Sequence, residues 1–168
     1  MDKKIENLKA KILEALTNAD IATMYVLQDE AVEIFDDESL NGFFANILDL
    51  ALENLTNTLE SCSSLDMDKV QDFATLRALY EYAMEHYHAG AIKDASALFE
   101  VLTGITKDES FTIALKYHLI ASQNTIDLDT FLNTYADLNK TQKSKTFYIS
   151  CFKDTAQELL DLKKTTTE

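Results

Sequence analysis

Apolar residues recur at three- and four-residue intervals along most of this chain, which is the spacing that lines one face of an α-helix. The first such set predicts a helix over residues 3–16 and consists of Ile5, Leu8, Ile12 and Leu16. The pattern resumes over residues 21–35 and predicts a second helix there. Between the two, TNAD interrupts the pattern, because asparagine and aspartate side chains compete for backbone hydrogen bonds and cap helices well.

A third and longer helix is predicted over residues 39–59, with Ser39 as a candidate cap. Its apolar positions cover more than one face. A helix of this kind is either enclosed in the fold or shared with another subunit. On the second alternative the sequence predicts a homodimer whose contacts are made by Leu40, Phe44, Ile47, Leu48 and Leu55.

The sequence ESCSSLD, residues 60–66, is a cluster of small and polar residues of the kind found in linkers. We expect it to separate an N-terminal helical region, residues 1–62, from helical repeats over residues 66–163, with a frayed tail at 164–168. Asp68 and Gln71 resemble a capping box. The helices predicted after the linker span residues 68–89, 92–103, 108–122, 127–138 and 141–162.

The helices over residues 68–89 and 92–103 are separated by a very short turn at Gly90, which forces them antiparallel and close. Glycine takes the left-handed conformation at no steric cost, so Gly90 ends the first helix, and we expect Gly104 to end the second in the same way. Close crossing needs small side chains at the contact, and Ala83 and Ala95 supply them.

Composition supports helices throughout. The 168 residues include no proline and only three glycines, and 46% of them are hydrophobic, enough for one core or two small ones. The predicted fold class is all-α.

The net charge of −14 bears on the choice of partners. Such a surface repels phosphate backbones and anionic lipid headgroups, so we expect no nucleic acid and no membrane as partners. No stretch reaches eighteen apolar residues, and the first twenty residues do not resemble a signal peptide, so a cytoplasmic location is expected. Cys62 and Cys151 lie far apart without a CxxC pair and are interpreted as reduced thiols.

One segment resembles a known repeat. The tetratricopeptide repeat is a 34-residue helical hairpin with small and large residues at fixed offsets. The residues that carry the resemblance are Leu79, Tyr82, Ala83, Tyr87, Gly90, Ala95, Phe99 and Leu102. The longer run LYxxAxxxYxxGxxxDAxxxFxxL, followed by TKDES, resembles the first repeat of the tetratricopeptide-type chaperones of bacterial type III secretion, which hold translocator proteins before export.

The resemblance implies a superhelix of antiparallel hairpins, a bacterial cytoplasmic location, a homodimer and a client protein segment as partner, with no cofactor. It leaves open a translocator chaperone, a needle-subunit chaperone or a general adaptor. In such a hairpin the first helix lines a concave groove. The resemblance places there Arg77, Tyr80, Met84, Tyr87, His88, Phe111, His118 and Ser122.

Tyrosine, methionine and histidine suit an extended client, because rings and thioether accept apolar anchors while polar tips bond exposed backbone. The alternative is that Tyr80 and Met84 only fill the core between hairpins. The rival to client binding is a homodimeric helical scaffold without a chaperone role; an unrecognised small helical enzyme is a further one.

Catalytic and metal chemistry find no support in the sequence. His86 and His88 are two residues apart on a predicted helix and so cannot chelate one metal ion together. The acidic clusters lack the glycine and terminal glutamate of a calcium loop. No glycine-rich phosphate loop is present, and nothing places a histidine beside Cys151. We therefore expect no metal, no cofactor and no enzymatic activity.

Overall fold

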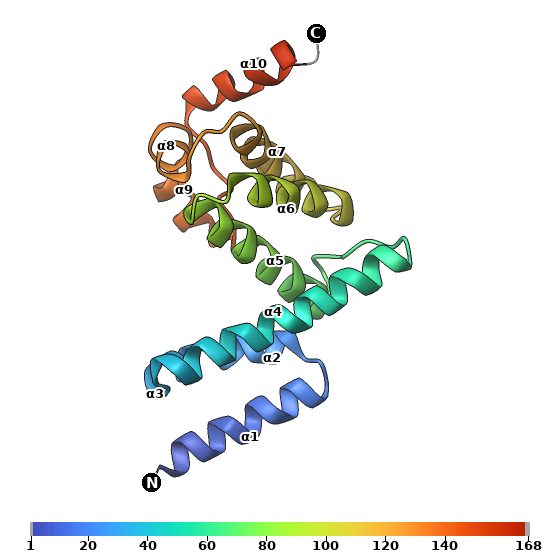
Figure 1. Ribbon diagram of the computed structural model, residues 1–168, viewed down its shortest axis with the longest axis vertical. Coiled ribbons are helices and arrows are strands. Elements are labelled where there is room, and N and C mark those ends of the chain that lie inside the picture. Colours follow the sequence, from blue (N-terminus) through green and yellow to red (C-terminus); the bar gives the residue numbers. More distant parts are fainter. Residues whose placement is uncertain (1, 167–168) are drawn as a thin grey trace. The chain divides into compact units, whose positions relative to one another are not determined.

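The computed structural model describes residues 2–166, with side chains described for residues 2–162, and it is built from helices (Figure 1). Within the described residues there is no strand, and an isolated antiparallel bridge pairs Ala136 with Phe152. The predicted all-α fold class is therefore confirmed. The chain divides into unit 1, Met1–Ala78, and unit 2, Leu79–Glu168.

Unit 1 contains α1 (Lys3–Thr17), α2 (Ile21–Val26), α3 (Gln28–Ile34), α4 (Asp37–Glu60) and the first turns of α5 (Val70–His88). The single helix predicted over residues 21–35 is thus divided at the buried Leu27, which lies between α2 and α3. The core of this unit includes Leu8, Ile21, Met24, Ala31, Phe43 and Ala51. An ion pair between Lys11 and Glu30 (3.8 Å) also joins α1 to α3.

Carboxylates cap two helices of unit 1. Asp20 accepts a hydrogen bond from the Thr23 N–H (3.0 Å) at the start of α2. Asp36 accepts one from the Ser39 N–H (2.8 Å) at the start of α4, so Asp36, and not Ser39, is the cap. A negative charge at a helix N-terminus also interacts favourably with the helix dipole.

The boundary between the units lies inside α5 rather than at the predicted linker, residues 60–66. Side chains on the first turns of α5 are bonded to earlier helices, and this explains the difference. Gln71 accepts from the Ala22 N–H (3.2 Å) and donates to Asp20 Oδ1 (2.6 Å), so it does not complete a capping box. Asn54 donates to the Thr75 hydroxyl (3.0 Å).

Unit 2 continues α5 and adds α6 (Ile92–Ile105), α7 (Glu109–Gln123), α8 (Leu128–Thr130), α9 (Leu138–Ser144) and α10 (Gln157–Thr166). A π-helical turn, Phe131–Tyr135, follows α8. The predicted turn is confirmed, because Gly90 has a φ of +84° between α5 and α6. The predicted stop at Gly104 is wrong, since α6 continues through it to Ile105.

The helix predicted over residues 141–162 is also wrong. After α9, Lys145 takes a left-handed conformation (φ +57°), and residues 146–153 leave the helix. The Asp137 N–H donates to Cys151 O (2.9 Å) and the Lys153 N–H to Tyr135 O (2.8 Å), so this segment is bonded to the chain just before α9. We call residues 146–152 the core segment.

Helix α10 then includes residues 164–166, which were predicted to fray, while residues 167–168 of that predicted tail lie outside the described residues. None of the helices described over residues 2–166 is both long enough and apolar enough to cross a membrane.

Candidate functional site

Most residues predicted to line a peptide groove lie in the core of unit 2. The side chains of five of the eight are buried: Tyr80, Tyr87, Phe111, His118 and Ser122. Of the other three, Met84 is half-buried, His88 is exposed and Arg77 belongs to unit 1. The placement of those five on an open groove is therefore wrong, and for Tyr80 the alternative of core packing is correct.

The core segment accounts for this burial. The rings of Phe147 and Tyr148 pack on Phe111 of α7, with centroid distances of 5.3 and 4.6 Å. Phe152 packs on Tyr117 of the same helix, with centroids 4.4 Å apart. The chain thus covers with its own residues the face that the repeat resemblance assigns to a client.

A chain of hydrogen bonds holds the core segment against α5 and α7. The Ile149 N–H donates to the Tyr80 hydroxyl (3.0 Å), and that hydroxyl lies 2.7 Å from His118 Nε2. His118 Nδ1 lies 2.7 Å from Ala114 O. A carbonyl oxygen only accepts, so Nδ1 carries the proton and Nε2 accepts from Tyr80. Each polar atom of this hydrogen-bond network therefore has a partner.

Burial also determines the charge state of this network. Desolvation lowers the pKa of His118 to about 4, although the Ala114 carbonyl partly opposes it. Desolvation raises the pKa of Tyr80. Both groups are neutral at pH 7 and enclosed by protein, and through the Ile149 N–H they hold the core segment in place.

Arg77 has a structural contact that the sequence did not indicate. Its guanidinium lies over the ring of Tyr25, 4.0 Å from the centroid, and its Nη2 is 3.4 Å from Gln28 Oε1. A cation on an aromatic face is a favourable pairing. Arg77 therefore joins α5 to α2 and α3 within unit 1.

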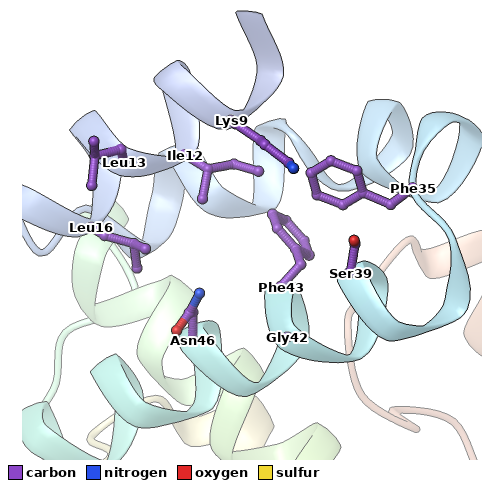
Figure 2. A pocket seen from close by; sticks show the side chains of 9 residues that line it. All are labelled: Lys9, Ile12, Leu13, Leu16, Phe35, Ser39, Gly42, Phe43 and Asn46. Atoms are coloured by element: carbon purple, nitrogen blue, oxygen red, sulfur yellow. The ribbon is translucent and has the colours of Figure 1, made fainter. Parts of the chain in front are cut away.

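Unit 1 contains an open apolar cleft between α1 and α4 (Figure 2). Its volume is about 340 Å³, and Ile12 and Phe43 form a buried floor. Leu13 stands at the rim, with 66% of its surface exposed. The full lining is Lys9, Ile12, Leu13, Leu16, Phe35, Ser39, Gly42, Phe43 and Asn46. We call this hollow and its extension, described next, the α1/α4 cleft.

The cleft extends toward the start of α1 as a second hollow of about 430 Å³, which shares Lys9, Phe35 and Ser39 with the first. This end is acidic: Asp2, Glu6 and Asp36 line it beside a single cation, Lys9. Hydrogen bonds from Ser39 hold the pKa of Asp36 below its usual range. The α1/α4 cleft is thus apolar at one end and negatively charged at the other.

The residues predicted to form a dimer contact are divided between core and surface. Ile47 is only 3% exposed and belongs to the core of unit 1, so its placement at a dimer contact is wrong. Phe44 is 38% exposed, and its ring meets Phe43 edge-on with centroids 5.4 Å apart. Partly exposed side chains on the same helix are Leu40, Leu48 and Leu55.

Over the part of the chain with described side chains, no three His, Cys, Asp or Glu residues gather as metal ligands would. Comparison of the chain with protein-family models, with curated protein sequences and with solved structures gives no match. The α1/α4 cleft offers an apolar surface that a ligand could cover, with charged side chains at one end.

Sequence reasoning missed this cleft, although two signals were present. Leu13 is apolar but lies beside the main stripe of α1, next to Ile12. Gly42 stands inside a long helix, where glycine is unfavourable relative to alanine. Both residues line the cleft.

Proposed function

We propose that this protein is a non-catalytic binding protein that holds an apolar segment of a client protein in the α1/α4 cleft. The observation that supports the proposal is an elongated apolar hollow that the described residues leave open, with a large side chain, Leu13, exposed at its rim. The proposal keeps the resemblance to tetratricopeptide-type secretion chaperones and, on that resemblance alone, a bacterial cytoplasmic location and no cofactor. It moves the client from the repeat face to unit 1.

The size and lining of the cleft agree with this role. Its two hollows fall within the roughly 300–1,000 Å³ typical of ligand sites. Complete burial of a leucine-sized side chain stabilises a complex by about 1.5–3 kcal/mol. A client that covers Leu13 and Leu16 while inserting two or three apolar side chains of its own has enough apolar area for specific binding.

Photo-crosslinking at Leu13 tests the proposal. With benzoylphenylalanine at this position, we expect one dominant crosslinked partner in cells of the native host, identified by mass spectrometry. The matched control is Val32 on α3, which is also an exposed aliphatic residue but does not line the cleft. Equal yields of the same crosslinked partner at Leu13 and Val32, or no crosslinked partner at Leu13, would rule out the cleft as the client site.

A homodimeric scaffold is the second candidate, and the exposed ring of Phe44 favours it. If α4 carries a dimer contact, Phe44→Asp is expected to weaken the dimer at least tenfold, because an ionised side chain at an apolar contact is strongly unfavourable. Light scattering across a concentration series measures this, with Val32→Asp as the control. A wild-type protein that stays monomeric at high concentration dismisses the scaffold.

A further inference from the structure

We infer that the occupant of the α1/α4 cleft is an amphipathic α-helix with lysine or arginine at one end, supplied by another protein. The inference rests on the proposed function and names the chemistry of its client. Three observations carry it: the helical walls of the cleft, the position of Gly42 and the distribution of charge.

The walls of the cleft favour a helix over an extended chain. In the first hollow they are formed by α1 and α4, apart from Phe35, and the backbone groups of these helices are bonded within their own helices. In the second hollow α1 faces the α3–α4 connection. An extended client would therefore bury N–H and C=O groups without backbone partners, whereas a helix satisfies its own. From Ile5 to Leu16 the α1 wall rises about 16 Å, the length of roughly three helical turns.

Gly42 gives a partner helix room to approach. A Cβ placed on Gly42 would meet no atom within 4 Å among the described residues, so the packing of this chain does not require a glycine there. One helical turn to either side, Ser39 and Asn46 also line the cleft with short side chains. Small residues on one wall permit close packing of helices.

Charge sets the chemistry of the two ends. The hollow near the start of α1 is lined by Asp2, Glu6 and Asp36 against the single cation Lys9. A helix whose apolar stripe lies over Ile12 and Phe43 and whose cationic end lies over this hollow complements both ends.

Synthetic peptides test the inference against the full chain. The probe is a fluorescein-labelled peptide of about 15 residues with leucines at i, i+4, i+7 and i+11 and two lysines at its C-terminal end, where cations suit a helix. Binding is measured by fluorescence anisotropy. We expect micromolar affinity. A peptide with a central proline on its polar face should bind at least tenfold more weakly, because proline breaks the helix.

Replacement of the two lysines by glutamates is expected to weaken binding at least fivefold at low salt, with the difference shrinking as salt rises. If the proline peptide binds as tightly as the parent, the occupant is extended and the inference fails. If the glutamate peptide binds as tightly as the parent, the inference that the occupant carries lysine or arginine at one end fails. Failure of the parent peptide to bind also overturns the inference.

Gly42→Leu fills the cleft and should weaken binding of the parent peptide at least tenfold. The matched control is Gly104→Leu, because Gly104 is also helical, exposed and free of neighbours within 4 Å. The control should stay within twofold of wild type. Should Gly42→Leu fail to fold, Leu13→Asp against Val32→Asp makes the same comparison at exposed positions. Equal affinities across either pair overturn the inference.

The crosslinking experiment distinguishes the two levels of the proposal. Capture of a client at Leu13 together with failure of the helical peptide overturns the helical occupant and leaves the proposed function in place. Capture of a second copy of this chain at Leu13 makes the occupant the protein itself and overturns both. If no partner is crosslinked at Leu13 and the helical peptide does not bind, both the proposed function and the helical occupant are overturned.

Discussion

Replacement of Tyr80 by phenylalanine is expected to lower the free energy of unfolding of unit 2 by about 2–4 kcal/mol. The ring contacts survive this change, but the hydroxyl is the acceptor for the Ile149 N–H and the donor to His118 Nε2. Its loss leaves two polar groups without partners inside the core, and each such group costs about 1–3 kcal/mol. The effect is large because the whole network is enclosed.

Urea denaturation followed by near-ultraviolet circular dichroism measures the change, since six of the seven tyrosines lie in unit 2. Tyr82→Phe is the matched control: it deletes a hydroxyl of the same helix outside the network and should cost no more than about 0.5 kcal/mol. A Tyr80→Phe cost close to that of the control would show that the Ile149–Tyr80–His118 chain does not hold the core segment.

Features determined by neighbours in sequence were predictable. The stripe beginning at Ile5 predicted α1, and the observed helix extends just one residue beyond the predicted end. Gly90 was assigned to a left-handed turn because glycine adopts that conformation without steric cost, and its φ agrees. In both cases the deciding interaction is contained in a few consecutive residues.

The core segment was not predictable in the same way. Its sequence, TFYISCF, contains neither proline nor glycine, so nothing local ends the helix predicted over residues 141–162. Its conformation is decided by residues outside the segment, one of them far away in the sequence. The Tyr80 hydroxyl, 69 residues earlier, accepts from Ile149, and Thr141 Oγ1 accepts from the N–H groups of Ser150 and Cys151. Long-range packing overrides periodicity here.

This difference also explains the outcome for the candidate site. The repeat pattern identified residues that share the inward face of α5 and α7, and three of them, Tyr80, Phe111 and His118, do lie together in unit 2. Whether that face is open depends on a segment some 30 to 70 positions away, which covers it. Conversely, the α1/α4 cleft is open because helices distant in sequence leave space between them, and periodicity within one helix carries no information on such a gap.

The stability of unit 2 is expected to fall as the pH drops below about 6.5, and His118 is the reason. The unfolded chain takes up a proton at this histidine near its ordinary pKa of about 6.5, whereas in the folded state burial lowers the pKa to about 4. Between these values the unfolded state binds more protons, so acid favours unfolding. At about 1.4 kcal/mol per pKa unit, the loss is about 2 kcal/mol at pH 5 and about 3 kcal/mol near pH 4.

Two measurements check this expectation. Urea denaturation from pH 7 to pH 4.5 gives the slope, and His118→Gln, which cannot titrate, should remove most of it whatever its stability at neutral pH. Asp127 caps α8 by accepting from the Thr130 N–H (2.8 Å). Like the caps Asp20 and Asp36, it has a lowered pKa, so the stability that these carboxylates supply is lost only at more acidic pH and does not obscure this window. Proton NMR of the folded protein should show the His118 ring titrating near pH 4. A midpoint near 6.5 would mean that the ring is solvated and that the core segment does not cover it.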